Sequence, residues 1–177
     1  MRKLQSTTPP VVVIRAATPD DAATIHSAIL KMGEDLGAVH KIESTSDDLA
    51  RSGLAAGRAF EGLIAEIGEE FAGMCLFFPS FSTWLGRPGV YVQDIFVDQR
   101  FRGLNVGAAL LQRCAALTRA KGATFLRLAA DADNFAAHGF YEKLGISHRP
   151  AERIHAAYGD AFQALADGDR RNERGTA

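Results

Sequence analysis

The sequence predicts an α/β protein in which helices flank a mixed, mostly antiparallel central sheet. The first observation is the order of its elements, which reads strand, two helices, three strands, helix, strand, helix, strand. The second is an acidic turn, Gly68-Glu69-Glu70, between two β-rich segments, which predicts a hairpin. The third is the composition, because 177 residues with 47% hydrophobic and 23% charged residues suit one domain with its own core.

The individual elements follow from local signals. Pro9-Pro10 closes an expected disordered lead at 1–10, so the domain is placed at 11–166 and a charged tail at 167–177. Thr18-Pro19-Asp20-Asp21 is typical of a helix start, with a cap, a first-turn proline and acids near the helix dipole. The expected strands are 11–15, 59–67, 71–78, 89–97, 124–130 and 153–157. The other expected helices start at Ser46, at about 106, at Asn134 and at Ala161. Residues 79–88 are expected to form a loop.

The chain is organised around 97–119, where a strand runs into a basic, glycine-containing turn and then into a helix. Gly103 and Gly107 lack a Cβ, so the backbone can turn tightly and direct its N–H groups at a ligand. The helix that follows adds unpaired N–H groups and the positive end of its dipole. Together with Arg100 and Arg102 they predict a phosphate-binding loop, the alternative being a plain turn with two solvated arginines.

Two common phosphate loops do not fit this turn. A Walker loop requires lysine after its last glycine, and no lysine follows Gly107 until Lys121. The dinucleotide fingerprint requires a glycine where Asn105 stands. The remaining pattern, R-x-x-N-x-G from Arg102, resembles the R-x-x-G-x-G/A loop that holds the acetyl-CoA pyrophosphate in the GNAT N-acetyltransferases. Asn105 replaces a family glycine, and asparagine tolerates a left-handed backbone at modest cost.

Further segments extend the resemblance to the diamine (spermidine/spermine) N-acetyltransferase branch. The segments similar to this branch are 82–87, 91–97, 127–129 and 134–145, and 14–21 resembles the opening strand and helix of the family as a whole. The resemblance implies the GNAT (acyl-CoA N-acyltransferase) fold and a homodimer paired through late strands and the C-terminal segment. It also implies acetyl-CoA as co-substrate, without a metal, and acetyl transfer to a primary amine, expected to be a small molecule, by direct attack in a ternary complex.

The same resemblance assigns roles to residues of this sequence. It implies that one tyrosine, Tyr141, protonates the departing CoA thiolate, and that Asn134 hydrogen-bonds the cofactor. By residue type alone, Asn134 is equally a helix cap and Tyr141 a packing aromatic. The strand end offers backbone groups to the pantetheine arm through Ile95, Phe96 and Val97. The loop holds the pyrophosphate through Arg102, Gly103, Leu104, Asn105, Val106 and Gly107.

The acceptor amine is expected near Gln93 and Asp94, where the branch has two carboxylates. Gln93 cannot ionise, so Asp94 alone remains as an acidic group. Strand alternation puts the two side chains on opposite faces unless a bulge intervenes. Trp84 is either a lid on the core or a wall of the substrate site. By residue type His138 and His155 are alternative bases.

Charge and composition exclude several other classes. The net charge of −1 gives no global nucleic-acid signal, and the apolar run Val11-Val12-Val13-Ile14 is too short for a signal peptide or a membrane span. The chain is therefore expected to be cytoplasmic. Cys75 and Cys114 are interpreted as buried thiols and not as a disulfide or metal site. Two rival functions remain: an acyl-CoA sensor without turnover, and a protein or peptide N-acetyltransferase with an open acceptor groove.

Overall fold

The computed structural model describes residues 10–174 except 56 and 58, with side chains up to 167. The expected disordered lead therefore lies, apart from Pro10, outside the described residues. Contacts divide the chain into two compact units, Met1–Ala132 and Asp133–Ala177. The first unit contains the sheet and its main helices, and the second contains two helices and the segment between them.

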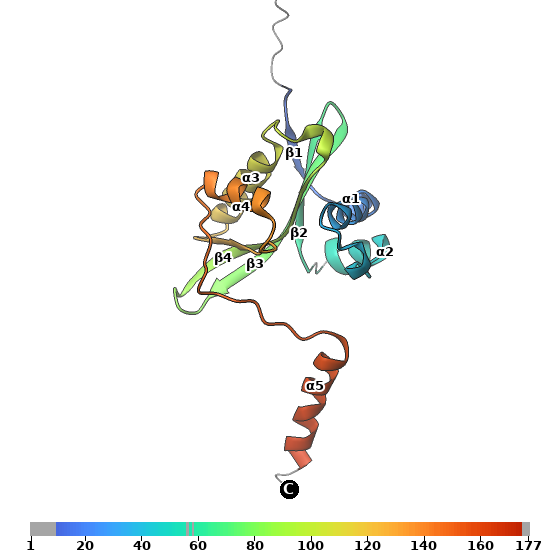
Figure 1. The fold of residues 1–177 in the computed structure, drawn as a ribbon, viewed down its shortest axis with the longest axis vertical. Coiled ribbons are helices and arrows are strands. Elements are labelled where there is room, and N and C mark those ends of the chain that lie inside the picture. The colour runs from blue at the N-terminus through green and yellow to red at the C-terminus, as the bar shows by residue number, and fades with distance from the viewer. Residues whose placement is uncertain (1–9, 56, 58, 175–177) are drawn as a thin grey trace, which may run out of the picture. The chain divides into compact units, whose positions relative to one another are not determined.

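The first unit is built on a five-stranded sheet in the order β1-β2-β3-β4-β5 (Figure 1). Its strands are β1 (Val13–Ala16), β2 (Glu61–Ile67), β3 (Glu70–Ser82), β4 (Arg87–Val97) and β5 (Leu126–Leu128). The first four pair antiparallel, and β5 pairs parallel to β4 because the chain returns through a helix before forming it. The predicted mixed, mostly antiparallel sheet is confirmed.

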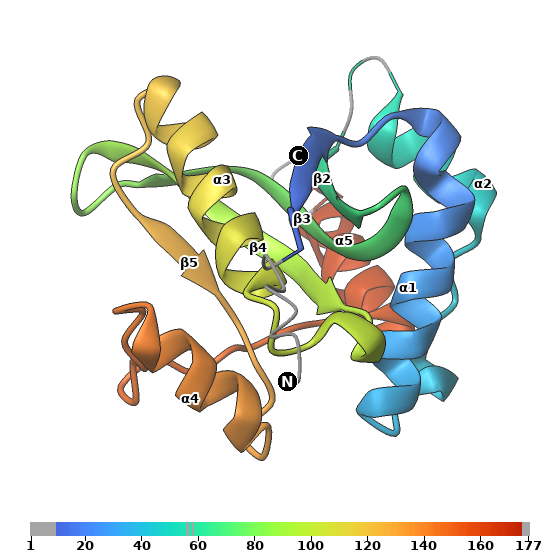
Figure 2. The same ribbon diagram turned by 90° about the horizontal axis from the view of Figure 1, so that it is seen from above.

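Helices α1 (Ala22–Asp35) and α3 (Val106–Ala120) lie on opposite faces of this sheet (Figure 1 and Figure 2). On the α1 face, Ile25 and Ala28 pack in one cluster with Met74 and Phe96 of the strands. Alternation turns the neighbouring strand residues the other way, toward α3. The helix α3 buries Val106, Ala108, Leu110, Leu111 and Cys114.

Short helical turns connect these elements. Before α1, Thr18 and Asp21 form a reciprocal capping box, which confirms the predicted helix start. The expected second helix from Ser46 is irregular: one α-helical turn capped by Thr45 passes into a π-helical segment. The short segments are η1 (Pro19–Asp21), η2 (Val39–Lys41), α2 (Ser46–Asp48), η3 (Leu49–Leu54) and η4 (Gln99–Phe101).

The loop expected at 79–88 is wrong, because both strands of the hairpin continue through it. Ser82 pairs with Arg87, so only 83–86 form the turn, with Gly86 at a φ of +62°. Proline and glycine favour turns locally, but pairing between two long strands overrides that preference here.

The second unit holds α4 (Phe135–Lys143) and α5 (Gly159–Arg174). The strand expected at 153–157 is wrong, since 152–158 has no regular structure. A strand needs a neighbouring strand to satisfy its backbone, and a β-rich stretch of sequence does not supply one. The last helix is longer than the predicted 161–166.

Candidate active site

The predicted phosphate loop connects β4 to α3 with the expected backbone. Gly103 has a φ of +81°, and Asn105 is left-handed at φ 64° and ψ 14°, as its tolerance of that region predicted. Asn105 precedes the first residue of α3 but makes no side-chain cap hydrogen bond. No capping side chain therefore competes at this helix start for an incoming anion.

Arg102 is the basic residue of this loop, and its guanidinium is held on two sides. Its Nε donates to the Val97 carbonyl at 3.1 Å, and its Nη2 pairs with the Asp35 carboxylate at the end of α1. The side chain stays half-exposed. Its remaining donors can therefore meet a ligand.

Arg100 faces a different environment from Arg102. Its Nη1 lies 2.6 Å from Glu70 Oε2, and its Nε donates to Asp98 Oδ1 at 3.1 Å. The Asp98 side chain is only 7% exposed, and Arg100, followed by Lys31, holds its pKa at about 2. The Arg100 guanidinium therefore pairs with the carboxylates of Glu70 and Asp98.

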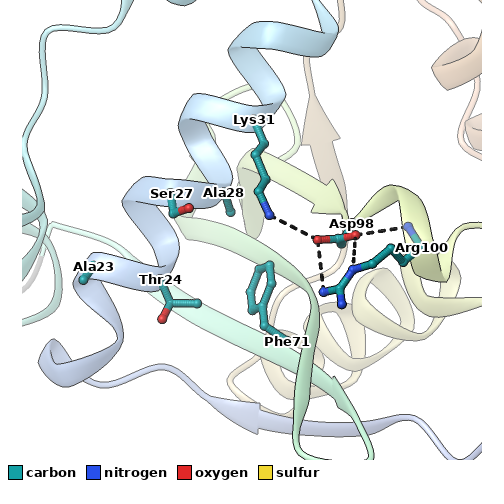
Figure 3. Close-up of a pocket in the computed structure, with 8 residues that line it drawn as sticks. All are labelled: Ala23, Thr24, Ser27, Ala28, Lys31, Phe71, Asp98 and Arg100. Atoms are coloured by element: carbon teal, nitrogen blue, oxygen red, sulfur yellow. Dashed lines mark hydrogen bonds and ion pairs between the residues drawn. The ribbon is translucent and has the colours of Figure 1, made fainter.

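Arg100, Asp98 and Lys31 line an open groove of about 370 Å³ between α1, the start of β3 and the end of β4 (Figure 3). Lys31 reaches from α1 to the Asp98 carboxylate, which Arg100 approaches from the opposite side, while Phe71 lies on the strand beside them. The groove is lined by Ala23, Thr24, Ser27, Ala28, Lys31, Phe71, Asp98 and Arg100. Sequence reasoning missed both acidic partners: Asp98 lies only two residues from Arg100 and could have been noticed as its neighbour, whereas nothing local indicates that Asp35 of α1 contacts Arg102, 67 residues away.

The strand β4 carries a bulge at Gln93. Leu76 pairs with Asp94 and Phe77 with Val92, so Gln93 has no partner of its own on β3. Bulges interrupt strict alternation and re-aim side chains, often beside active sites. The sequence predicted that the side chains of Gln93 and Asp94 lie on opposite faces of the sheet unless a bulge intervenes. The bulge is present, so strand alternation does not place them on opposite faces here.

Asp94 is half-buried, whereas Gln93 is exposed. Burial raises the pKa of Asp94 above its usual value. Its side chain accepts no hydrogen bond in the part of the chain that the structure describes. An unengaged carboxyl with a raised pKa is suited to accept a proton.

Beyond the bulge, β4 has a partner on one side. Val90, Tyr91 and Val92 pair with β5, and that ladder stops at the bulge. Ile95, Phe96 and Val97 pair with β3, but the β5 ladder does not reach them. Among the described strands, this leaves the β5-facing edge of β4 available to an extended ligand immediately before the loop.

Trp84 lies at the turn between β3 and β4 and is 98% exposed, so it does not cover the core. It is at the opposite end of β4 from the phosphate loop. The ten residue steps of that strand span about 30 Å at roughly 3.3 Å per residue.

Asn134 and Tyr141 belong to the second unit. The Asn134 Oδ1 accepts a hydrogen bond from the Ala137 N–H at 3.1 Å, which confirms the predicted helix cap. Tyr141 is half-buried in α4 with its ring 5.3 Å from Phe140. His138 lies in the same helix, 5.9 Å from the His148 ring, and His155 is exposed.

The two cysteines are free and fully buried, as predicted. The neighbouring Cys114 thiol and burial together raise the pKa of the Cys75 thiol. Within the described ranges, no three His, Cys, Asp or Glu side chains cluster as metal ligands would. Nor does any described helix combine the length and apolar character that a membrane span needs.

A helix start without a side-chain cap, close after a strand edge that pairs with no described strand, is the arrangement expected of a class of proteins that bind an extended anionic ligand. Comparison with known proteins gives the family. The sequence profile of the acetyltransferase (GNAT) family matches residues 31–146. The chain belongs to this family and is an N-acetyltransferase.

Two relatives and one solved structure show where the similarity lies. Thialysine N-epsilon-acetyltransferase of Mus musculus is 30% identical over 140 residues, covering 75% of this chain and 82% of the mouse protein. Spermidine/spermine N(1)-acetyltransferase-like protein 1 of Homo sapiens is 28% identical over 107 residues, covering 56% of this chain and 15% of the human protein. The structure of ribosomal-protein-alanine N-acetyltransferase from Brucella melitensis superposes with a TM-score of 0.68 at 19% identity, over 84% of this chain and all of that one. The relatives are consistent with the predicted diamine branch, and the superposition shows the fold.

Proposed function

We propose that this enzyme transfers the acetyl group of acetyl-CoA to the primary amine of a small, cationic molecule. The observation that carries the proposal is the unpaired edge of β4 leading directly into the loop from Arg102 to Gly107. The names of the mouse and human relatives support amines of the thialysine and polyamine kind as acceptors.

The residues present fit acetyl-CoA. The backbone of Ile95, Phe96 and Val97 would hydrogen-bond the pantetheine arm as an added strand does. A side chain added at Gly103 would meet nothing within 4 Å, so this part of the loop surface is open. Pyrophosphate would be held by the loop from Arg102 through Gly103, Leu104, Asn105 and Val106 to Gly107. The resemblance to the diamine branch assigns Asn134 a hydrogen bond to the cofactor.

Asp94 is the group proposed to act on the acceptor. A protonated amine cannot attack a thioester, so it must first lose a proton, and Asp94 is a half-buried carboxyl with a raised pKa. Attack of the freed amine nitrogen on the thioester carbonyl would form the C–N bond as the C–S bond breaks, and the nitrogen would release its second proton to solvent while the departing thiolate takes up another. Gln93 would contribute a neutral hydrogen bond to the acceptor, and Trp84 is proposed as a distant wall for extended acceptors.

Tyr141 is proposed to donate the proton that the departing thiolate takes up. The assignment rests on the similarity of 134–145 to the diamine branch, since a phenol is a suitable single-proton donor. The exposed Tyr158 is a matched control in the same unit, because it is 82% exposed and lies outside that segment.

The test is a thiol-release assay with acetyl-CoA over thialysine, polyamines, amino acids, aminoglycosides and peptides, with products identified by mass spectrometry. Tyr141→Phe is expected to lower kcat about 100-fold with little change in KM, and Tyr158→Phe to have no effect. Full turnover by Tyr141→Phe would refute the acid assignment. Tight acetyl-CoA binding with no acetylated amine in the panel would indicate a sensor instead, and acetylation restricted to peptides a protein acetyltransferase.

We also propose that residues 11–166 act as one acetyltransferase domain in a homodimer located in the cytoplasm. The family match at 31–146 extends across both compact units, which supports a single functional domain. Large apolar side chains of the second unit are exposed, as a subunit interface requires: Ile154, Phe162 and Leu165. Light scattering over a range of protein concentrations tests whether the chain forms a dimer. Limited proteolysis tests whether residues 11–166 form one domain, and cell fractionation tests whether the protein is in the cytoplasm.

A further inference from the structure

The last two turns of α1 contact the segment between β4 and α3 through two charged residues. Lys31 and Asp35 are four positions apart, so they share one face of the helix. Lys31 Nζ lies 3.3 Å from Asp98 Oδ2 (Figure 3). Asp35 reaches the residues just beyond, Gln99 and Arg102. Helix α1 therefore holds both the start and the end of the turn that precedes the loop.

The Asp35 carboxylate bridges two groups of that turn. One oxygen accepts from Gln99 Nε2 at 2.8 Å, and the other pairs with Arg102 Nη2. The side chain is 27% exposed, and its pairing with Arg102 lowers its pKa. Asp35 therefore stays ionised in neutral solution, with each oxygen engaged.

The orientation of Arg102 follows from these contacts. Its Nε bonds the Val97 carbonyl and its Nη2 bonds Asp35, so two edges of the planar guanidinium are fixed, while both N–H donors of Nη1 are unengaged by the described residues. A side chain that is already ordered loses less rotamer freedom when it binds phosphate. Val97 is also the last residue of the unpaired strand edge, so the same contacts tie the loop to that edge.

We propose that Asp35 is a positioning residue for acetyl-CoA: its carboxylate holds Arg102 and Gln99 against α1, so that the pyrophosphate loop is ordered before the cofactor arrives. The inference rests on the proposed function, because it assigns Arg102 to the pyrophosphate. The opposite role would be competition, in which Asp35 withholds Arg102 from phosphate. The two roles predict opposite changes in affinity when the carboxylate is removed.

The experiment is calorimetric titration of the full chain with coenzyme A, for wild type, Asp35→Ala, Asp35→Asn, Asp35→Glu, Arg102→Ala and the double variant D35A/R102A. The Kd is expected to rise about tenfold in Asp35→Ala, the scale set by two side chains that must then be ordered on binding. The Kd of Asp35→Asn should lie between those of wild type and Asp35→Ala, and Asp35→Glu should recover most of the wild-type affinity. In the Arg102→Ala background, Asp35→Ala should add less than twofold.

The matched control is Glu61→Ala. Glu61 pairs with Lys121 at 2.6 Å and is 26% exposed, close to Asp35, but it lies on β2 away from the loop. It should leave the Kd for coenzyme A unchanged. In steady-state assays Asp35→Ala should raise KM for acetyl-CoA about tenfold and leave kcat and the amine KM within twofold, a separation that general loss of folded protein does not produce.

The outcomes separate the inference from the function on which it rests. Failure of the wild-type chain to bind coenzyme A would refute the proposed function itself. Wild-type binding with an unchanged or tighter Kd in both Asp35→Ala and Asp35→Asn would overturn the positioning role. An equal loss from Asp35→Ala with and without Arg102 would overturn it as well. If Asp35→Ala does not fold, the isosteric Asp35→Asn and the Asp35→Glu recovery decide the question.

Discussion

Asn105 carries a backbone conformation that most residues avoid, and this makes the loop testable by substitution. It sits at φ 64° and ψ 14°, is exposed, and makes no side-chain cap hydrogen bond. Truncating its side chain therefore removes no side-chain hydrogen bond to the described residues and changes mainly the backbone preference. The left-handed region costs an ordinary L-residue roughly 1–2 kcal/mol, asparagine less, and glycine almost nothing.

We therefore predict that Asn105→Ala loses about 1 kcal/mol relative to wild type, and that Asn105→Gly stays within about 0.5 kcal/mol because its greater freedom when unfolded offsets the relief of strain. The loss takes one of two forms. If the alanine variant keeps the left-handed loop, the loss appears as reduced stability, equivalent to about 3 °C in Tm for a chain of this size. If its loop relaxes, the loss appears as a roughly fivefold weaker Kd for coenzyme A, because the loop must be re-formed on binding.

Urea unfolding and calorimetric titration on the same preparations measure both forms. Glu69 is the control: among described residues it is the other non-glycine with a positive φ, at 69°, and it lies in the β2–β3 turn. Glu69→Gly should leave coenzyme A binding unchanged. If Asn105→Ala matches Asn105→Gly in both stability and affinity, the left-handed loop and the argument from it are wrong.

Three further predictions concern packing, pH and thiols. In Gly73→Ala the new Cβ would lie 2.5 Å from the Phe96 carbonyl oxygen, a backbone atom that cannot move aside, so urea unfolding should show a loss of about 1–3 kcal/mol in the free energy of unfolding. In Gly139→Ala of α4 the new Cβ would meet nothing within 4 Å, so the free energy of unfolding should rise by up to about 1 kcal/mol. Equal effects of the two substitutions would contradict the packing. Because the pKa of Asp98 falls from 3.8 to about 2 on folding, its ionised carboxylate stabilises the fold above pH 4, and this stability is lost as the pH falls toward 2. The contribution should be about 1–2 kcal/mol after discounting for its half-exposed cationic partners. Asp98→Asn should flatten the dependence of the free energy of unfolding on pH between pH 4 and 2. Neither Cys75 nor Cys114 should react with a thiol reagent until the chain unfolds, and rapid labelling of native protein would refute their burial.

Much of the fold was predictable because its signals are local. The capping box at Thr18, the acidic hairpin turn and the glycines around Arg102 act within a few residues, and each was found where the sequence placed it. The errors occurred where pairing partners decide the outcome. The hairpin extends through 79–88 because two strands pair there, and 153–157 forms no strand.

The site divides in the same way. The sequence by itself determined the glycine-containing turn before α3, the left-handed tolerance of Asn105 and the cap formed by Asn134, because backbone preference and i-to-i+3 hydrogen bonds depend on neighbours along the chain. Only the tertiary structure decided the bulge at Gln93 and the burial that raises the pKa of Asp94, since a bulge is defined by the register of a partner strand. It also decided that Asp35, 67 residues before Arg102, holds that guanidinium, because charges distant in sequence become neighbours only when helix and strand pack together.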